Sequence, residues 1–170
     1  MLLWAFGPAA AQTAKLDDLF SQLQTSTDEE SAQITQNIWI EWSKSGSPTM
    51  DLLLKRGRDA LSAGNPQAAI EHFTALIDHA PDFAEGYNAR ATAYYQAGEL
   101  GPSVSDIAKA LTLNPRHFGA LSGLGQIFEQ LNEPAKALEV YKAALAINPH
   151  MTDVEDAVKR LEADLAGQDL

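Results

Sequence analysis

The sequence contains no cysteine among its 170 residues, which excludes disulfides, thiol catalysis and cysteine-bound zinc. Basic residues are also scarce, since 12 Lys and Arg stand against 23 Asp and Glu and give a formal net charge of −11. Such a charge would repel a phosphate backbone. We therefore expect no nucleic-acid partner.

Long apolar runs are missing as well. No stretch approaches the roughly 18 apolar residues of a membrane helix, so no membrane span is expected. The motifs HExxH, GxSxG and GxxxxGK[ST] are also absent, and we predict neither an enzyme nor a cofactor. With 45% hydrophobic residues, the chain is nevertheless long enough to bury a sizeable core.

The first eleven residues, MLLWAFGPAAA, resemble the end of a secretory signal peptide. A short apolar run leads to Ala9-Ala10-Ala11, the small-residue pattern that precedes a cleavage site, with Gln12 next. This pattern predicts export, to the periplasm or beyond. The alternative is an ordinary N-terminus of a cytoplasmic protein.

What the chain does contain is an internal period. Pro81, Pro115 and Pro149 are spaced by 34 residues and again by 34. Aligning residues 50–83, 84–117 and 118–151 brings similar residues into shared columns, such as Leu53, Tyr87 and Leu121, Gly57, Ala91 and Gly125, Ala60, Tyr94 and Phe128, Ala69, Ser103 and Ala137, and Phe73, Ile107 and Tyr141. Large and small apolar residues at helical spacing predict two closely nested antiparallel helices in each segment.

Turn residues separate the two helices of each segment. The turns are AGNP, AGELGP and LNEP, where Gly64 and Gly98 suit a left-handed cap and the prolines suit the first turn of the next helix. These columns resemble the tetratricopeptide repeat (TPR) family, and we expect a bacterial member that is exported, as the first eleven residues predict. The resemblance implies an all-α, right-handed superhelical solenoid of antiparallel helix pairs, with three repeats at residues 50–83, 84–117 and 118–151.

The two ends depart from the repeat. Residues 15–46 predict a helical hairpin with a capping box at Thr27 and Glu30. We interpret it as a degenerate leading repeat that covers the first true repeat, with an independent hairpin packed elsewhere as the alternative. Residues 152–166 carry an apolar stripe with one polar face and predict a C-terminal capping helix.

Several residues invite a chemical role but have a simpler explanation. His117 and His150 lie in predicted loops, where hydrated side chains are usual, and we predict no metal site. Paired acids at helix starts suit the positive end of the helix dipole. Arg56 and Arg90 share one column, and we favour a structural role for both.

In the family that this sequence resembles, the front helices line a concave groove that binds peptides or partner helices. The residues we assign to that groove are Leu54, Arg58, Asn88, Thr92, Tyr95, Gly119, Ser122, Gly123, Gln126 and Glu129. One subfamily grips acidic chaperone tails with a clamp of cations and amides. The corresponding positions here are Leu54, Arg58, Ala89, Gly119 and Gly123, which do not supply the clamp's set of cations, so we predict no such clamp.

The stretch RHFGALSGLG, residues 116–125, has the glycine content of a phosphate cradle but no strand before it. Gly125 occupies the column of close helix packing, while Gly119 and Gly123 would leave the groove wall bare. We therefore predict a non-enzymatic scaffold for an unidentified protein or peptide partner. The alternative is a homo-oligomer assembled through Trp39 and Trp42 or through an uncapped end.

Overall fold

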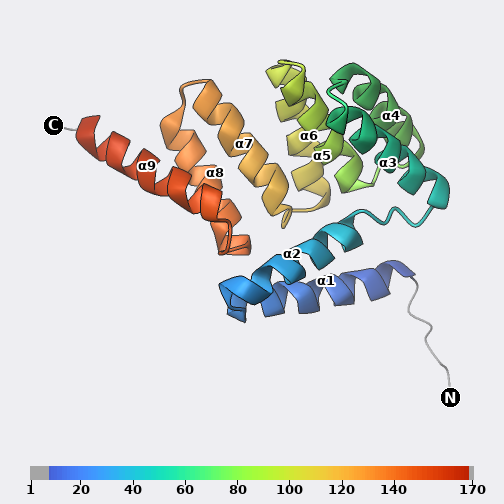
Figure 1. Ribbon diagram of the computed structural model, residues 1–170, viewed down its shortest axis with the longest axis horizontal. Helices are drawn as coiled ribbons and strands as arrows, with labels where there is room; N and C mark the ends of the chain where they lie inside the picture. Colours follow the sequence, from blue (N-terminus) through green and yellow to red (C-terminus); the bar gives the residue numbers. More distant parts are fainter. Residues whose placement is uncertain (1–7, 169–170) are drawn as a thin grey trace.

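The computed structural model describes residues 8–168, and every regular element among them is a helix (Figure 1). The elements are α1 (Pro8–Thr25), α2 (Asp28–Trp42), α3 (Pro48–Ser62), α4 (Pro66–His79), α5 (Ala84–Gln96), α6 (Leu100–Leu113), α7 (Phe118–Gln130), α8 (Pro134–Ile147) and α9 (Thr152–Gln168). Each helix from α3 to α8 packs against the next, and α3, α5 and α7 also contact one another in sequence. The all-helical solenoid that the family resemblance implies is confirmed.

The turns inside the repeats share one backbone geometry. Gly64 and Gly98 have φ of 71° and 79°, and Asn132 takes the equivalent place in the third repeat with φ of 56°. Glycine and asparagine tolerate this left-handed conformation better than other residues. Pro66 and Pro134 then begin α4 and α8, where the missing N–H costs no hydrogen bond.

Within a repeat, the helices nest where a glycine of one faces a ring of the other. A Cβ added to Gly57 would overlap the ring of Phe73, and one added to Gly125 would overlap the ring of Tyr141. Both rings are buried. The glycine column therefore sets the close approach of the two helices in the first and third repeats.

The second repeat is joined by an ion pair. Arg90 on α5 donates from Nε and a terminal nitrogen to the two carboxylate oxygens of Asp106 on α6, at 2.7 and 2.9 Å. The hydrogen bonds from Arg90 to Asp106 raise the pKa of Arg90 further above its ordinary value. The structural role predicted for Arg90 is confirmed, whereas Arg56 is exposed on α3.

The N-terminal hairpin does not stack on the first repeat. Helices α1 and α2 run side by side across the edge of the solenoid, below the other helices in the view of Figure 1. Their apolar side chains pack against Phe118, Ile147 and Met151, which belong to the junctions after α6 and α8. The prediction of a leading repeat is therefore wrong, and the alternative of a hairpin packed elsewhere is correct.

This placement has a physical cause. Trp39 and Trp42 match the repeat columns in sequence, but α2 also carries Glu41, which is 4% exposed and bound by Lys15 of α1. This pair joins α2 to α1 within the hairpin, while Trp42 packs on His117 and Phe118 and so holds the hairpin at the start of α7. The capping box of Thr27 and Glu30 begins α2 as predicted.

At the C-terminal end, the apolar face of α9 packs against the third repeat. Val154, Val158 and Leu161 form a buried cluster with Ala137 and Tyr141 of α8. Among residues 8–168, no helix is long and apolar enough to cross a membrane. Of the predicted signal-like segment 1–11, residues 1–7 and hence Trp4 lie outside the described part of the chain, whereas residues 8–11 form the first turn of α1.

Candidate functional site

The inner helices α3, α5 and α7 face α2 across a groove. Two cavities lie along it, which we call the proximal cavity, about 620 Å³, and the distal cavity, about 650 Å³. Trp39 of α2 and Asn88 and Thr92 of α5 line both cavities. The groove therefore has two walls, one made by the repeats and one made by the hairpin.

A buried carboxylate lies beneath the proximal cavity. Glu85, at the start of α5, is 3% exposed. It accepts hydrogen bonds from Arg58 of α3 at 2.6 Å, from Asn88 at 3.2 Å and from His117 Nε2 at 2.8 Å. Three donors satisfy the carboxylate, so its burial is compensated. The guanidinium of Arg58 is thereby neutralised within the groove wall.

His117 joins this network to the hairpin. Its Nδ1 accepts the backbone N–H of Ala120 and so caps α7, which leaves the proton on Nε2 for donation to Glu85. The imidazole stacks on the indole of Trp42, with ring centroids 4.2 Å apart and planes at 18°. His117 has no exposed surface, so the prediction of a hydrated loop residue is wrong.

His150 has a similar role at the next junction. Its Nδ1 lies 2.7 Å from a carboxylate oxygen of Asp28, and its Nε2 lies 3.1 Å from the backbone oxygen of Leu23. It is a second tie between the repeats and the hairpin and was also wrongly predicted as a hydrated side chain. No group of metal-ligating side chains occurs within residues 8–168.

Most of the groove residues predicted from the sequence do line the cavities. Arg58, Asn88 and Thr92 line the proximal cavity, and Gly119, Ser122, Gly123 and Gln126 line the distal one. Tyr95 lines a small pit of about 70 Å³ between α5 and α7. The structure therefore brings eight of the ten predicted residues to one surface.

The other two predicted groove residues lie elsewhere. Leu54 is 2% exposed and belongs to the core between α3 and α4. Glu129 accepts hydrogen bonds from Tyr141 and Arg160, at the junction of α7, α8 and α9. Burial and the hydrogen bond to Glu129 raise the pKa of Tyr141. Both assignments were wrong because Leu54 faces the core formed with α4 and α5, and because Tyr141 and Arg160 hold Glu129 on the side of α8 and α9.

The groove wall at Gly119, which was predicted to be open, is covered by another side chain of the protein. A Cβ on Gly119 would lie 2.6 Å from Cη2 of Trp39, so the indole occupies the space that the glycine leaves. Gly123 is different, since a Cβ there would meet only Ile107 Cδ1, at 3.9 Å. The chain thus covers part of its own groove and leaves the part at Gly123 open.

Sequence reasoning missed the second wall entirely. Gln36 and Ile40 of α2 and its C-cap Ser43 line the proximal cavity, and Ile40 is 45% exposed. A signal was available in the run IWIEW, where Ile38 and Trp42 point to one face and Ile40 to the other. An apolar residue on the second face of a hairpin helix indicates a surface with further contacts.

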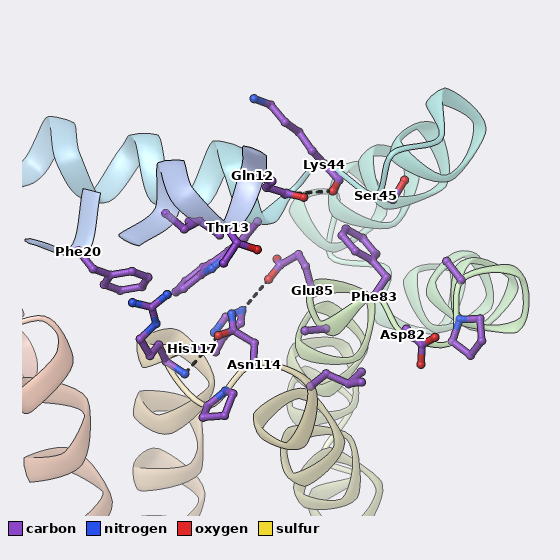
Figure 2. Close-up of a pocket in the computed structure, with 18 residues that line it drawn as sticks. Gln12, Thr13, Phe20, Lys44, Ser45, Asp82, Phe83, Glu85, Asn114 and His117 are labelled. Carbon is purple, nitrogen blue, oxygen red and sulfur yellow. Dashed lines mark hydrogen bonds and ion pairs between the residues drawn. The ribbon is translucent and has the colours of Figure 1, made fainter. Parts of the chain in front are cut away.

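A further cavity of about 570 Å³, the side cavity, lies between α1 and the junctions at residues 80–85 and 113–117. Figure 2 shows Gln12 and Phe20 of α1 facing Glu85 and His117 across it. Gln12 Nε2 donates to the backbone oxygen of Glu41 at 2.6 Å, which ties the start of α1 to the end of α2. Glu85 separates this cavity from the proximal one, because it lines both.

Comparison with known proteins agrees with this architecture. The family model of the tetratricopeptide repeat matches residues 54–101 and 103–152. A TPR repeat-containing protein of Rhizobium etli is 36% identical over 154 residues, which cover 90% of this chain and 76% of the relative. The chain belongs to the tetratricopeptide repeat family.

Other relatives share only part of their length with this chain. A protein SGT1 homolog of Bos taurus is 32% identical over 110 residues, or 65% of this chain and 32% of that protein. The first TPR of Spaghetti (RPAP3), solved with the HSP90 peptide SRMEEVD, superposes with a TM-score of 0.66 at 23% identity and covers 69% of this chain and 93% of its own. The similarity to this solved TPR structure supports the helical solenoid fold of the present chain.

Proposed function

We propose that this protein is a non-enzymatic adaptor that binds an extended segment of a partner protein in the groove between α2 and the inner helices. The observation that carries the proposal is the pair of cavities that share Trp39, Asn88 and Thr92 and run along one face. Concave, largely preformed surfaces with a few polar groups suit peptide recognition. The peptide-bound state of a TPR neighbour supports the same mode.

Thr92 offers a direct test. It is exposed and lines the proximal cavity, the distal cavity and the pit, so Thr92→Trp should obstruct all three. The matched control is Thr112→Trp on α6. Thr112 is also exposed and makes the same hydrogen bond to the carbonyl four residues earlier, but it lines none of the cavities described above.

The measurement is affinity capture of partners from the native host, compared by quantitative mass spectrometry. We expect partners retained by the wild type and by Thr112→Trp to fall at least tenfold with Thr92→Trp, while circular dichroism stays unchanged. If Thr92→Trp retains every partner at the wild-type level, the groove is not the binding surface and the proposal is wrong.

Self-assembly through the tryptophans has less support. Trp42 is 6% exposed, and Trp39 packs at an edge against Trp42 and Phe118 within the same chain. The aromatic surface predicted for a second copy is therefore used inside the protomer. Light scattering at micromolar concentration measures the oligomeric state directly.

We further propose export with cleavage after Ala11, from the Ala9-Ala10-Ala11 pattern. The contacts that Gln12 and Lys15 make with the end of α2 lie after this site, so removal of residues 1–11 leaves them in place. N-terminal sequencing of the protein from its native host should return Gln12, whereas an intact Met1 would favour the cytoplasmic alternative.

A further inference from the structure

The pit between α5 and α7 has the form of a pocket for one side chain. Its floor and walls are mainly apolar and come from Ala91, Tyr95, Ile107, Gly119, Gly123 and Ile127. It holds about 70 Å³, enough for a few heavy atoms, because one water occupies on the order of 10–15 Å³ on this measure. Asn88, Thr92, Gly119, Gly123 and Gln126 line both the pit and the distal cavity, so the pit opens into the groove.

The chain does not fill this pit itself. Trp39 occupies the space over Gly119, but at Gly123 the nearest atom that an added Cβ would meet is Ile107 Cδ1, at 3.9 Å. Glycine inside a helix lowers stability by about 1 kcal/mol relative to alanine. Gly123 therefore leaves an opening that close packing of the helices does not require, in contrast to Gly125 on the same helix.

A largely buried amide lies at the rim. Asn88 is 9% exposed, and its Nδ2 donates to Glu85. Within the described part of the chain its Oδ1 has no hydrogen-bond donor, and Asn88 lines the pit and both larger cavities. No buried side-chain oxygen or nitrogen of the described residues lacks a hydrogen-bond partner, so this oxygen is accessible to solvent and can accept a peptide N–H in place of water.

The charges that line the groove indicate the charge of the segment that it binds. The two basic residues in the wall of the proximal cavity are already paired, Arg58 with Glu85 and Lys44 with Glu41. The distal cavity contains no Lys or Arg in its lining, and the whole chain carries a net charge of −11. An acidic segment would meet repulsion without a free cation to offset it, whereas a basic segment would be attracted and a neutral segment would not be repelled.

We propose that the groove binds an extended, neutral or basic peptide segment that inserts one small aliphatic side chain, of alanine or valine size, into the pit over Gly123. Asn88 Oδ1 accepts a backbone N–H of that segment. This inference rests on the proposed adaptor function and specifies its ligand. The proposed ligand differs in charge from the acidic peptide SRMEEVD that was solved with the first TPR of Spaghetti (RPAP3).

The test uses the full chain and a phage-displayed library of random 12-residue peptides. Selections run in parallel on the wild type, Gly123→Leu and Gly101→Leu. The leucine at 123 fills the pit, whereas Gly101 is exposed in the first turn of α6 with no atom within 4 Å of an added Cβ, which makes it a matched control. Gly123→Ala serves as a milder second variant, and circular dichroism verifies the fold of each.

We expect wild-type selections to enrich one alanine or valine position flanked by Lys or Arg, with Asp and Glu depleted. Synthetic copies of the enriched peptides should bind the wild type and Gly101→Leu equally and Gly123→Leu at least tenfold more weakly. Replacing the anchor residue by tryptophan should weaken binding to the wild type by a similar factor.

Enrichment of acidic peptides would overturn the inference, and so would equal binding of the peptides to Gly123→Leu and the wild type. The adaptor function would still stand in either case if Thr92→Trp abolishes the capture of partners. If the wild type enriches no peptide, the inference fails. If capture also gives no partner sensitive to Thr92→Trp, the adaptor function fails with it.

Discussion

At the scale of single residues, the glycines show which features can be read from the sequence. Gly57 and Gly125 were assigned to close packing from their shared column, and each faces a ring of the paired helix. Gly119 stands in no such column, yet it receives Trp39 from a helix about 80 residues earlier in the chain. Similar residues in one column of the repeats reflect packing that the repeats share. They cannot predict a contact between one repeat and a helix outside the repeats.

Gly125→Ala tests the packing role. The added methyl group would overlap the Tyr141 ring, which is 3% exposed and hydrogen-bonded to Glu129, so the ring has little room to move. We expect a loss of about 1–3 kcal/mol in the free energy of unfolding, measured by urea denaturation. The control Gly101→Ala should instead stabilise α6 by about 0.5–1 kcal/mol, and equal effects for both would contradict the packing role.

At the scale of elements, the hairpin is the part that the sequence described least well. Its helices and its capping box were predicted, but its position depends on His117, which stacks on Trp42, and on His150, which contacts Asp28. Periodicity indicates which face of a helix is apolar and leaves open which surface covers that face. The second wall of the groove, with Ile40, was missed for this reason.

Glu41→Gln tests the link between α1 and α2 and predicts a pH dependence. Burial would raise the pKa of Glu41, but hydrogen bonds from Lys15 and Lys44 outweigh it, and the pKa lies below its ordinary value of 4.5. A lowered pKa in the folded state means that the carboxylate stabilises the fold above about pH 4.5 and loses this contribution as the pH falls.

We therefore expect Glu41→Gln to lower the free energy of unfolding by about 1–2 kcal/mol at pH 7, because both lysines are half exposed and remain solvated. The difference from the wild type should shrink as the pH falls below 4.5. Glu71→Gln, an exposed change on α4, is the control and should show no such pattern. A difference that is constant from pH 7 to pH 3 would argue against the pair.

At the scale of the whole molecule, the repeats and the hairpin are coupled in different ways. Helices α3 to α9 contact mainly their neighbours, as in other solenoids, so a local defect should stay local. The hairpin instead crosses the junctions, since Gln24 donates to the carbonyl of Ile147 while Ser43 accepts from Arg58 of the first repeat. It therefore joins the two ends of the repeat array.

Leu161→Asp tests the locality of the capping helix. Leu161 is 3% exposed in the cluster of α8 and α9, so an aspartate there should detach α9 at a cost of about 3–5 kcal/mol. Hydrogen exchange followed by mass spectrometry should show faster exchange in α8 and α9 and unchanged exchange in α3 and α4. Ala163→Asp, exposed on the same helix, is the control, and faster exchange throughout the chain would contradict the local model.

The sequence by itself determined the class of fold and the three repeats, because its 34-residue period predicts nested helix pairs and its columns resemble a repeat family whose helix pairs stack. It also placed most of the groove residues, since a front helix in a stack has only one concave face. Only the tertiary structure decided where the hairpin lies, that His117 and Glu85 are buried together, and that Trp39 covers Gly119 while Gly123 stays open. Those features arise from contacts between residues far apart in the chain, where no local period constrains the partner.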